Sequence, residues 1–119
     1  MKYFFDTYAL IEIALQNKKF EQFVDEDAVT LKTNLAEMYF FLLKKFNQRT
    51  ADHFLHQFGS CAVDFPLEII APAMLFKSKQ EKHFSYIDCL GYSYALFFGR
   101  TFLTGDRAFE SMEQVEIVR

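Results

Sequence analysis

Short strand-like runs alternate with longer segments of helical spacing along the chain, and this alternation limits the folds open to it. Apolar or alternating runs predict strands at residues 2–5, 28–31, 61–65, 101–103 and 115–118. Apolar side chains at helical spacing predict helices at residues 7–16, 20–24, 35–46, 50–58, 66–79, 86–98 and 107–112. Strands that alternate with helices form a parallel sheet with helices on both faces. We therefore expect an α/β fold around a central, mostly parallel sheet.

Glycine and proline mark where several of these helices begin, end or break. Gly59 follows the helix at 50–58 in the C-cap position, and Gly99 ends the strongly apolar helix at 86–98. Pro66 suits the first turn of the segment 66–79, whereas Pro72 is expected to kink or divide it. The polar stretch 78–83 then predicts a loop.

The chain has 119 residues, which is the size of about one domain, and we expect a single domain over residues 1–119. Its composition, 51% hydrophobic and 24% charged, is that of an ordered protein. The longest uncharged apolar run, 89–99, is shorter than the ~20 residues that cross a bilayer. The first residues lead into a strand instead of a signal-peptide pattern. We therefore expect no membrane segment and a cytoplasmic location.

Cysteines, net charge and aromatic content each narrow the class of protein. Cys61 and Cys89 are too few for a disulfide framework and lack zinc-binding spacing, so we expect buried thiols. The net charge of -3 argues against holding nucleic acid through overall positive potential but allows local basic patches. Sixteen phenylalanines exceed what a small core readily buries. Some should lie at an interface with a second copy or a tightly bound partner.

Four acidic residues stand in apolar surroundings at or near the ends of the expected elements: Asp6, Glu37, Asp88 and Asp106. Asp6 and Asp106 follow predicted strands, and sites in parallel sheets form beyond the carboxyl ends of the strands. Carboxylates suit Mg²⁺ and Mn²⁺, which prefer oxygen ligands and keep waters for contact with phosphate. Such an ion activates a bound water for attack on phosphorus. The pattern predicts a metal site that acts on a phosphodiester.

Each acid, taken singly, also has a purely structural explanation. Asp6 could cap the helix that it precedes, and Asp106 fits ordinary turn chemistry. The other two acids each stand three residues after a typical capping residue, Asn34 before Glu37 and Ser85 before Asp88. The metal site is therefore indicated by the four acids together.

Four local patterns stand out at these acids: Phe-Asp-Thr at 5–7, the isolated Glu37, Ser-Tyr-Ile-Asp at 85–88 and Thr-Gly-Asp-Arg-Ala-Phe at 104–109. Together they resemble the PIN domain, particularly the small VapC-type toxins of toxin–antitoxin modules. The resemblance covers nearly the whole chain, and the closing Thr-x-Asp-x-x-Phe arrangement is its most recognisable feature. It implies a three-layer α/β/α PIN-like fold with a central, mostly parallel sheet.

The resemblance also implies a function and a set of site residues. Asp6, Glu37, Asp88 and Asp106 would be the catalytic acids and hold one or two Mg²⁺ or Mn²⁺ ions, with Thr104 supporting them through hydrogen bonding. The implied activity is an endoribonuclease that cleaves RNA with metal-activated water and leaves a 5′-phosphate and a 3′-hydroxyl. The implied partners are an RNA substrate, a cognate antitoxin that covers the acidic site, and a second copy in a homodimer.

The chain departs from the family pattern at two places. Tyr8 stands where many relatives have Ser or Thr, and it could narrow access to the site. Cys89, Gly91 and Tyr92 follow the third acid, where small residues dominate in the family. These departures leave a catalytically inactive PIN-like binding module as the alternative. A phosphotransfer enzyme with Asp6 as nucleophile is disfavoured, because Tyr8 occupies the position of the second acid that it needs.

Basic residues could contact an RNA backbone through its phosphates. Arg107 is the favoured candidate, because it adjoins the last acid. Further candidates lie near the helix at 35–46 and in the stretch before Asp88: Lys44, Lys45, Arg49, Lys77, Lys79 and Lys82. We interpret the remaining polar candidates as solvated helix residues without a ligand role: Glu12, His53, His56, Glu110 and Glu113.

Overall fold

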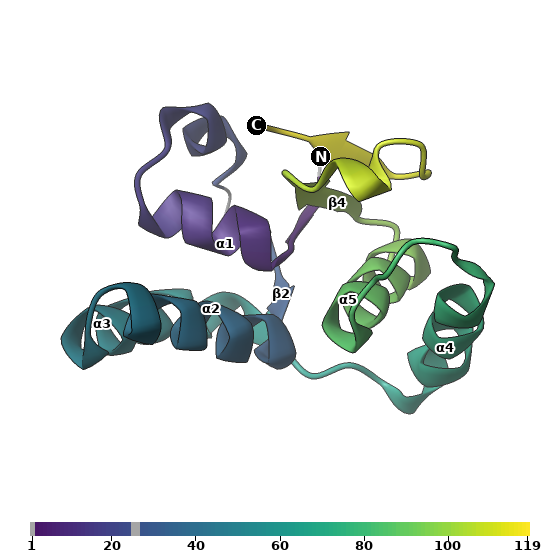
Figure 1. The fold of residues 1–119 in the computed structure, drawn as a ribbon, viewed down its shortest axis with the longest axis horizontal. Coiled ribbons are helices and arrows are strands. Elements are labelled where there is room, and N and C mark those ends of the chain that lie inside the picture. The colour runs from purple at the N-terminus through teal and green to yellow at the C-terminus, as the bar shows by residue number, and fades with distance from the viewer. Residues whose placement is uncertain (1, 25–26) are drawn as a thin grey trace.

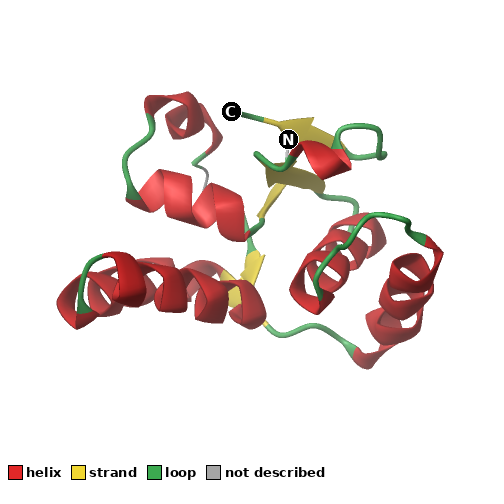
Figure 2. Ribbon diagram, in the orientation of Figure 1, coloured by secondary structure: helices red, strands yellow, loops and turns green. Residues whose placement is uncertain are grey.

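The computed structural model describes residues 2–24 and 27–119, and in this part strands and helices alternate as expected (Figures 1 and 2). The strands are β1 (Tyr3–Phe5), β2 (Thr30–Leu31), β3 (Ala62–Val63), β4 (Thr101–Thr104) and β5 (Val115–Ile117). The α-helices are α1 (Thr7–Ala14), α2 (Lys32–Lys45), α3 (Gln48–Phe58), α4 (Ile70–Lys79) and α5 (Tyr86–Phe97). Short 3₁₀-helices are η1 (Lys18–Phe23), η2 (Gly59–Cys61), η3 (Leu67–Ile69) and η4 (Arg107–Phe109).

All the strand pairs among the described residues are parallel. One sheet has the order β1-β4-β5, with Phe5 beside Leu103 and Thr104 beside Ile117. Strands β2 and β3 form a second pair, and an isolated bridge between Phe4 and Val29 joins it to β1. The strands therefore lie in the order β3-β2-β1-β4-β5. The predicted α/β fold with a parallel sheet is confirmed.

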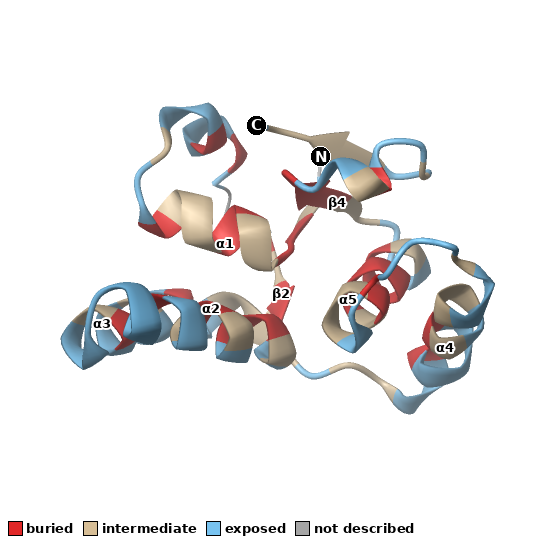
Figure 3. Ribbon diagram, viewed as in Figure 1, coloured by how far each residue is buried: buried red, intermediate tan, exposed pale blue. Residues whose placement is uncertain are grey.

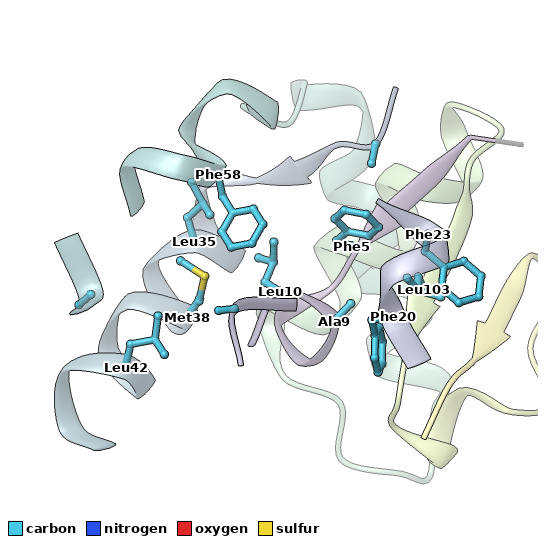
Figure 4. Close-up of a cluster of buried hydrophobic side chains, with 13 residues drawn as sticks. Phe5, Ala9, Leu10, Phe20, Phe23, Leu35, Met38, Leu42, Phe58 and Leu103 are labelled. Atoms are coloured by element: carbon cyan, nitrogen blue, oxygen red, sulfur yellow. The ribbon is translucent and has the colours of Figure 1, made fainter. Parts of the chain in front are cut away.

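Helices α1, α2 and α3 cover one side of the strands. Apolar side chains recur on α1 and α2 every three or four residues, which places them on one face of each helix. Figure 4 shows Leu35 and Met38 of α2 directed toward Leu10 of α1, with Phe58 of α3 beside them. Phe5 of β1 extends the same cluster toward the sheet.

Helices α4 and α5 lie on the other side, so that the strands are enclosed between two helical layers (Figures 1 and 3). The core here is an aromatic cluster of fully or almost fully buried rings: Phe4, Phe84, Tyr92, Phe102 and Phe109. Phe109 has its ring centroid 4.5 Å from that of Phe84 and 4.8 Å from that of Phe102. Such tilted pairs add to the free energy gained by burying the rings.

One predicted helix boundary, the start of α2 at residue 35, was wrong. Helix α2 begins at Lys32, after Leu31, whose side chain cannot cap it, so Asn34 is an interior residue and not the N-cap. The capping explanation of Glu37 is thereby removed. Helix α4 ends at Lys79, as predicted, so the loop expected at 78–83 begins only after this residue and Ser78 lies in the helix. Pro72 falls in the first turn of α4, where a missing N–H breaks no intrahelical bond, and the division of the segment lies before it, between η3 and α4.

The other local predictions hold with smaller adjustments. Gly99 follows α5 with φ +66°, the left-handed conformation in which glycine ends helices. Both cysteines are free thiols, but only Cys89 is buried, and Cys61 is half-buried. None of the helices in residues 2–24 and 27–119 has the length and hydropathy needed to cross a bilayer.

Candidate metal centre

Asp6 lies at the carboxyl end of β1 and caps the helix that follows. Its Oδ1 accepts a hydrogen bond from the N–H of Ala9 at 2.9 Å, as a helix N-cap does. Asp6 as a whole is 4% exposed. Burial raises its pKa to about 7, hydrogen bonds from Thr104 and Ala9 act against this rise, and the charges of Asp88 and Asp106 add to it. The fold therefore keeps this carboxyl group away from water, although its charged form is more stable in water.

Asp106 lies at the carboxyl end of β4, the neighbour of β1. Its Oδ1 accepts from the N–H of Ala108 at 2.9 Å, which caps η4. Its own N–H donates to the hydroxyl oxygen of Thr104 at 3.0 Å. Thr104 is fully buried and also hydrogen-bonds to Asp6. One threonine therefore connects the two acids that follow adjacent strands.

Asp88 reaches the same place from the first turn of α5. Asp88 and Ser85 form a capping box, in which the N–H of each donates to the side chain of the other at 3.0 Å. Burial raises the pKa of the Asp88 carboxyl, the hydrogen bonds with Ser85 lower it, and the nearby charge of Asp106 raises it further. The Lys77 ammonium lowers it in turn.

Asp6, Asp88 and Asp106 line one cleft of about 300 Å³, which we call the acidic cleft. The other residues that line it are Thr7, Tyr8, Gly105, Arg107 and Arg119. The capping explanations of Asp6 and Asp88 are correct, and Asp106, which was explained by turn chemistry, also caps a helix. Each cap uses a single carboxylate oxygen. A carboxylate has two oxygens and about four acceptor sites. Capping a helix therefore leaves each acid able to bind a further donor or a cation.

Glu37 is not in this cleft. It lines a neighbouring groove of about 770 Å³ between α1 and α2, which we call the apolar groove. The groove is lined by Thr7, Ile11, Ala36, Glu37, Phe40, Phe41, Lys44, Lys45 and Ile87. Thr7 belongs to both sites, and its hydroxyl donates to Glu37 Oε1 at 2.5 Å. The structure therefore brings three of the four predicted acids together in one cleft. The fourth, Glu37, is separated from that cleft by the side chain of Thr7.

The donors of the acidic cleft suit a hard divalent cation. The acids that line the cleft are all aspartates, and no cysteine or histidine lines it among the residues that the structure describes. Burial and, to a smaller extent, the charges of Asp88 and Asp106 raise the pKa of Asp6, and a bound cation would offset both effects. Among the described residues, no three acidic, histidine or cysteine side chains are gathered tightly enough to form a ligand group. Mg²⁺ keeps several of its waters when bound, so it requires few direct protein ligands.

Tyr8 and Gly105 face each other in the wall of the acidic cleft. A Cβ at position 105 would lie 2.0 Å from Cε1 of Tyr8, so only glycine fits beneath this ring. Tyr8 narrows the cleft but leaves it open. The second departure from the family pattern does not reach the cleft, because Cys89, Gly91 and Tyr92 are buried in the core. A Cβ on Gly91 would lie 3.0 Å from the Phe4 ring, which explains the glycine.

Two arginines border the acidic cleft. Arg107 was expected there, whereas Arg119 was missed, because nothing in the local sequence marks it. Both are exposed, and neither forms an ion pair with a carboxylate in the described part of the chain. Their guanidinium groups are therefore available to an anion that enters the cleft.

The other basic candidates lie elsewhere. Lys44 and Lys45 line the apolar groove. Lys77 donates to the carbonyl of Phe84 at 2.5 Å, and Lys82 donates to the carbonyl of Ala108 at 3.1 Å. Arg49 and Lys79 are exposed, and none of these six lines the acidic cleft.

The residues interpreted as solvated charges are also outside the cleft. His53, His56, Glu110 and Glu113 are exposed. Glu12 is half-buried and accepts a hydrogen bond from Asn17 at 2.8 Å.

No protein-family model and no curated protein sequence matches the chain, but solved structures do match its fold. VapC20 of Mycobacterium tuberculosis, a sarcin-ricin loop cleaving toxin, matches with a TM-score of 0.79 and 12% identity, over 93% of this chain and 95% of its own.

Two toxin–antitoxin structures match almost as well. The chain from a toxin–antitoxin complex of Klebsiella pneumoniae has a TM-score of 0.76 and 14% identity, over 96% of this chain and 95% of its own. VapBC2 from Rickettsia felis, bound to a DNA fragment from its promoter, has a TM-score of 0.74 and 15% identity, over 99% and 98%. The chain therefore has the PIN-like fold of the VapC toxins.

Proposed function

We propose that this protein is a Mg²⁺- or Mn²⁺-dependent endoribonuclease and the toxin of a toxin–antitoxin module. The observation that carries the proposal is the meeting of Asp6, Asp88 and Asp106 in one cleft at the carboxyl ends of β1 and β4. The three acids come from separate segments of the chain, yet all direct a carboxylate to the same cleft. The full-length match to VapC20, which cleaves the sarcin-ricin loop, supports RNA as the substrate class.

In this proposal Asp6, Asp88 and Asp106 hold the divalent cation, and Glu37 completes the set of acids from the edge of the apolar groove. Thr104 supports these acids: its hydroxyl oxygen accepts from the N–H of Asp106, and its hydrogen bonding acts against the rise in the pKa of Asp6. When bound, the cation lowers the pKa of a coordinated water and neutralises charge on the phosphorus oxygens. Arg107 contacts the phosphate beside the one that is cleaved.

Hydrolysis of the phosphodiester adds one water across the P–O3′ bond. The water oxygen forms the new bond to phosphorus, the P–O3′ bond breaks, and the 3′ oxygen gains a proton. The products are a 5′-phosphate and a 3′-hydroxyl. Burial and the neighbouring carboxylates raise the pKa of Asp6 and of Asp88, so negative charge in this cleft is unfavourable when no cation is bound. A cation in the cleft would reduce the repulsion that an entering phosphate meets.

We further propose that an antitoxin covers the acidic cleft and that the protein is a cytoplasmic homodimer. Five of the sixteen phenylalanines are exposed: Phe40, Phe41, Phe46, Phe97 and Phe98. Exposed rings in such number mark association surfaces. Two of the matched structures are a toxin–antitoxin complex and VapBC2, which supports an antitoxin as partner. Light scattering tests the dimer, and a monomer at high concentration would contradict it.

The test of activity is cleavage of total RNA by purified protein with Mg²⁺ or Mn²⁺, beside a chelator. We expect metal-dependent cleavage that Asp88→Asn lowers at least about 100-fold, above the usual contribution of residues that merely orient a ligand. The matched control is Glu110→Gln, which removes an exposed charge outside the cleft and should cleave as the wild type does.

Cleavage that survives the chelator, or an Asp88→Asn protein as active as the wild type, would contradict the proposed mechanism. A folded wild type that neither cleaves RNA nor binds Mn²⁺ would favour the alternative, an inactive PIN-like binding module.

A further inference from the structure

Glu37 depends on one neighbour for its orientation. Its carboxylate accepts the hydrogen bond from Thr7, and no other hydrogen bond to it is formed among the described residues. The groove around it is mainly apolar, with Ile11, Phe40 and Ile87 in its walls. Thr7 follows Asp6 directly and lines both the groove and the acidic cleft. This hydroxyl is therefore the link between Glu37 and the other three acids.

Asn34 holds Thr7 in turn. It lies one turn before Glu37 on α2, is 2% exposed, and its Nδ2 donates to Thr7 Oγ1 at 3.1 Å. Because the hydroxyl oxygen accepts from the amide, its own proton is free for the Glu37 carboxylate, which can only accept. The hydrogen bonds therefore run in one direction, from Asn34 through Thr7 to Glu37.

The stability of the fold does not explain an asparagine at this position. Its Oδ1 is buried and has no hydrogen-bond partner in the described part of the chain. Leaving a buried acceptor unpaired costs about 1–3 kcal/mol. An apolar side chain of similar size would avoid that cost. The Asn34 amide therefore has an unpaired acceptor on one side and a donor to Thr7 on the other, an arrangement that calls for an explanation other than stability.

We propose that Thr7 and Asn34 are positioning residues, which hold the Glu37 carboxylate toward the cation of the acidic cleft. The inference rests on the proposed function, since it assumes that the cleft binds a divalent cation. Side chains that orient metal ligands typically change metal affinity by about 10- to 100-fold when they are replaced. The same order is expected here, because among the described residues the Thr7 hydroxyl is the only hydrogen-bond donor to Glu37.

The test is a calorimetric titration of the purified protein with Mn²⁺ alone, beside its melting temperature in chelator. Thr7→Val keeps the shape of the side chain and removes both hydrogen bonds, and we expect it to weaken Mn²⁺ binding about 10-fold. Thr7→Ser keeps the hydroxyl and should bind within about threefold of the wild type. Asn34→Leu removes the unpaired amide, so it should melt at or above the wild-type temperature yet bind Mn²⁺ several-fold more weakly.

The two hypotheses fail in different ways. A wild type that binds no Mn²⁺ overturns the proposed function and this inference with it. A wild type that binds Mn²⁺, together with a folded Thr7→Val or Asn34→Leu protein of equal affinity, overturns the positioning role alone. Equal weakening by Thr7→Ser and Thr7→Val also overturns it, because the hydroxyl would then not be the group that matters.

Discussion

Strand β4 contributes residues to two regions, and burial has opposite effects on the stability of the fold in these two regions. Phe102 enters the aromatic cluster, where burying a ring is favourable by about 25 cal/mol for each Å² of apolar surface. Thr104, two residues later, bonds to Asp6, a carboxyl group whose burial raises its pKa to about 7. The cluster therefore stabilises the fold, whereas the acidic cleft lowers its stability unless a cation compensates the charge. Substitutions in the two regions should therefore change stability in opposite directions.

The largest effect is expected in the aromatic cluster. Phe109→Ala empties a fully buried position in contact with Phe84, Tyr92 and Phe102. We expect the free energy of unfolding to fall by about 3–5 kcal/mol, which urea denaturation would measure. A loss below about 1 kcal/mol would show that this cluster does not carry the fold.

A smaller effect of opposite sign is expected at Asp6. The pKa of its carboxyl group is about 7 in the folded protein, whereas the ordinary value of an aspartate, which applies to the unfolded chain, is 3.8. Between these values the folded state binds more protons, so this group makes stability fall as the pH rises from about 4 to 7. The difference of about three pKa units, 7 − 3.8, corresponds to at most about 4 kcal/mol.

Asp6→Asn should remove this pH dependence, because asparagine carries no charge and still caps a helix well. In chelator at pH 8 the variant should be more stable than the wild type. Urea denaturation across this pH range measures it. A wild type whose stability changes from pH 4 to 7 by the same amount as that of the variant would contradict the raised pKa.

An intermediate effect is expected where the cleft meets the core. Gly105→Ala places a methyl group against the Tyr8 ring and should destabilise the protein by about 1–3 kcal/mol. The cost should shrink in a Tyr8→Ala background, since the obstructing ring is gone. The double-mutant cycle measures this coupling. Full additivity would mean that the ring and the glycine do not constrain each other.

The smallest effect is expected on the surface. Phe40 is 63% exposed at the apolar groove, so Phe40→Ala should change the free energy of unfolding by no more than about 0.5 kcal/mol. It is the matched control for Phe109→Ala, because the two variants delete the same ring. A loss above about 1 kcal/mol at Phe40 that does not depend on protein concentration would place this residue in the core of the monomer, because a loss at the proposed dimer interface would depend on concentration.

Features with a local signal could be predicted from the sequence. The capping box of Ser85 and Asp88 and the positive φ of Gly99 delimit α5, and both are marked by residue type. The start of α2 could not be predicted, because its N-cap residue, Leu31, forms no side-chain hydrogen bond. Asn34 is a typical N-cap residue type, but it lies inside the helix. A helix start without a capping side chain has no local signal.

The candidate site could be predicted only in part, for a related reason. Asp6 and Asp106 were expected together because both follow parallel strands, and the cleft does bring them together. Glu37 lies apart, and its link through Thr7 and Asn34 joins residues about 30 positions from one another. The contact of Tyr8 with Gly105 spans the chain as well. Such pairings arise from tertiary packing, which residue types and spacing do not encode.

The most direct test of a cation site in the acidic cleft is the melting temperature of the wild type and Asp6→Asn at pH 8, each in chelator and in Mn²⁺. We expect the order of the two proteins to reverse. In chelator the variant should melt higher, because it lacks a buried charge. In Mn²⁺ the wild type should gain about 2.7 kcal/mol at a hundredfold excess over its Kd and melt higher. A wild type unmoved by Mn²⁺, or a variant that gains as much, would contradict a cation site in the acidic cleft.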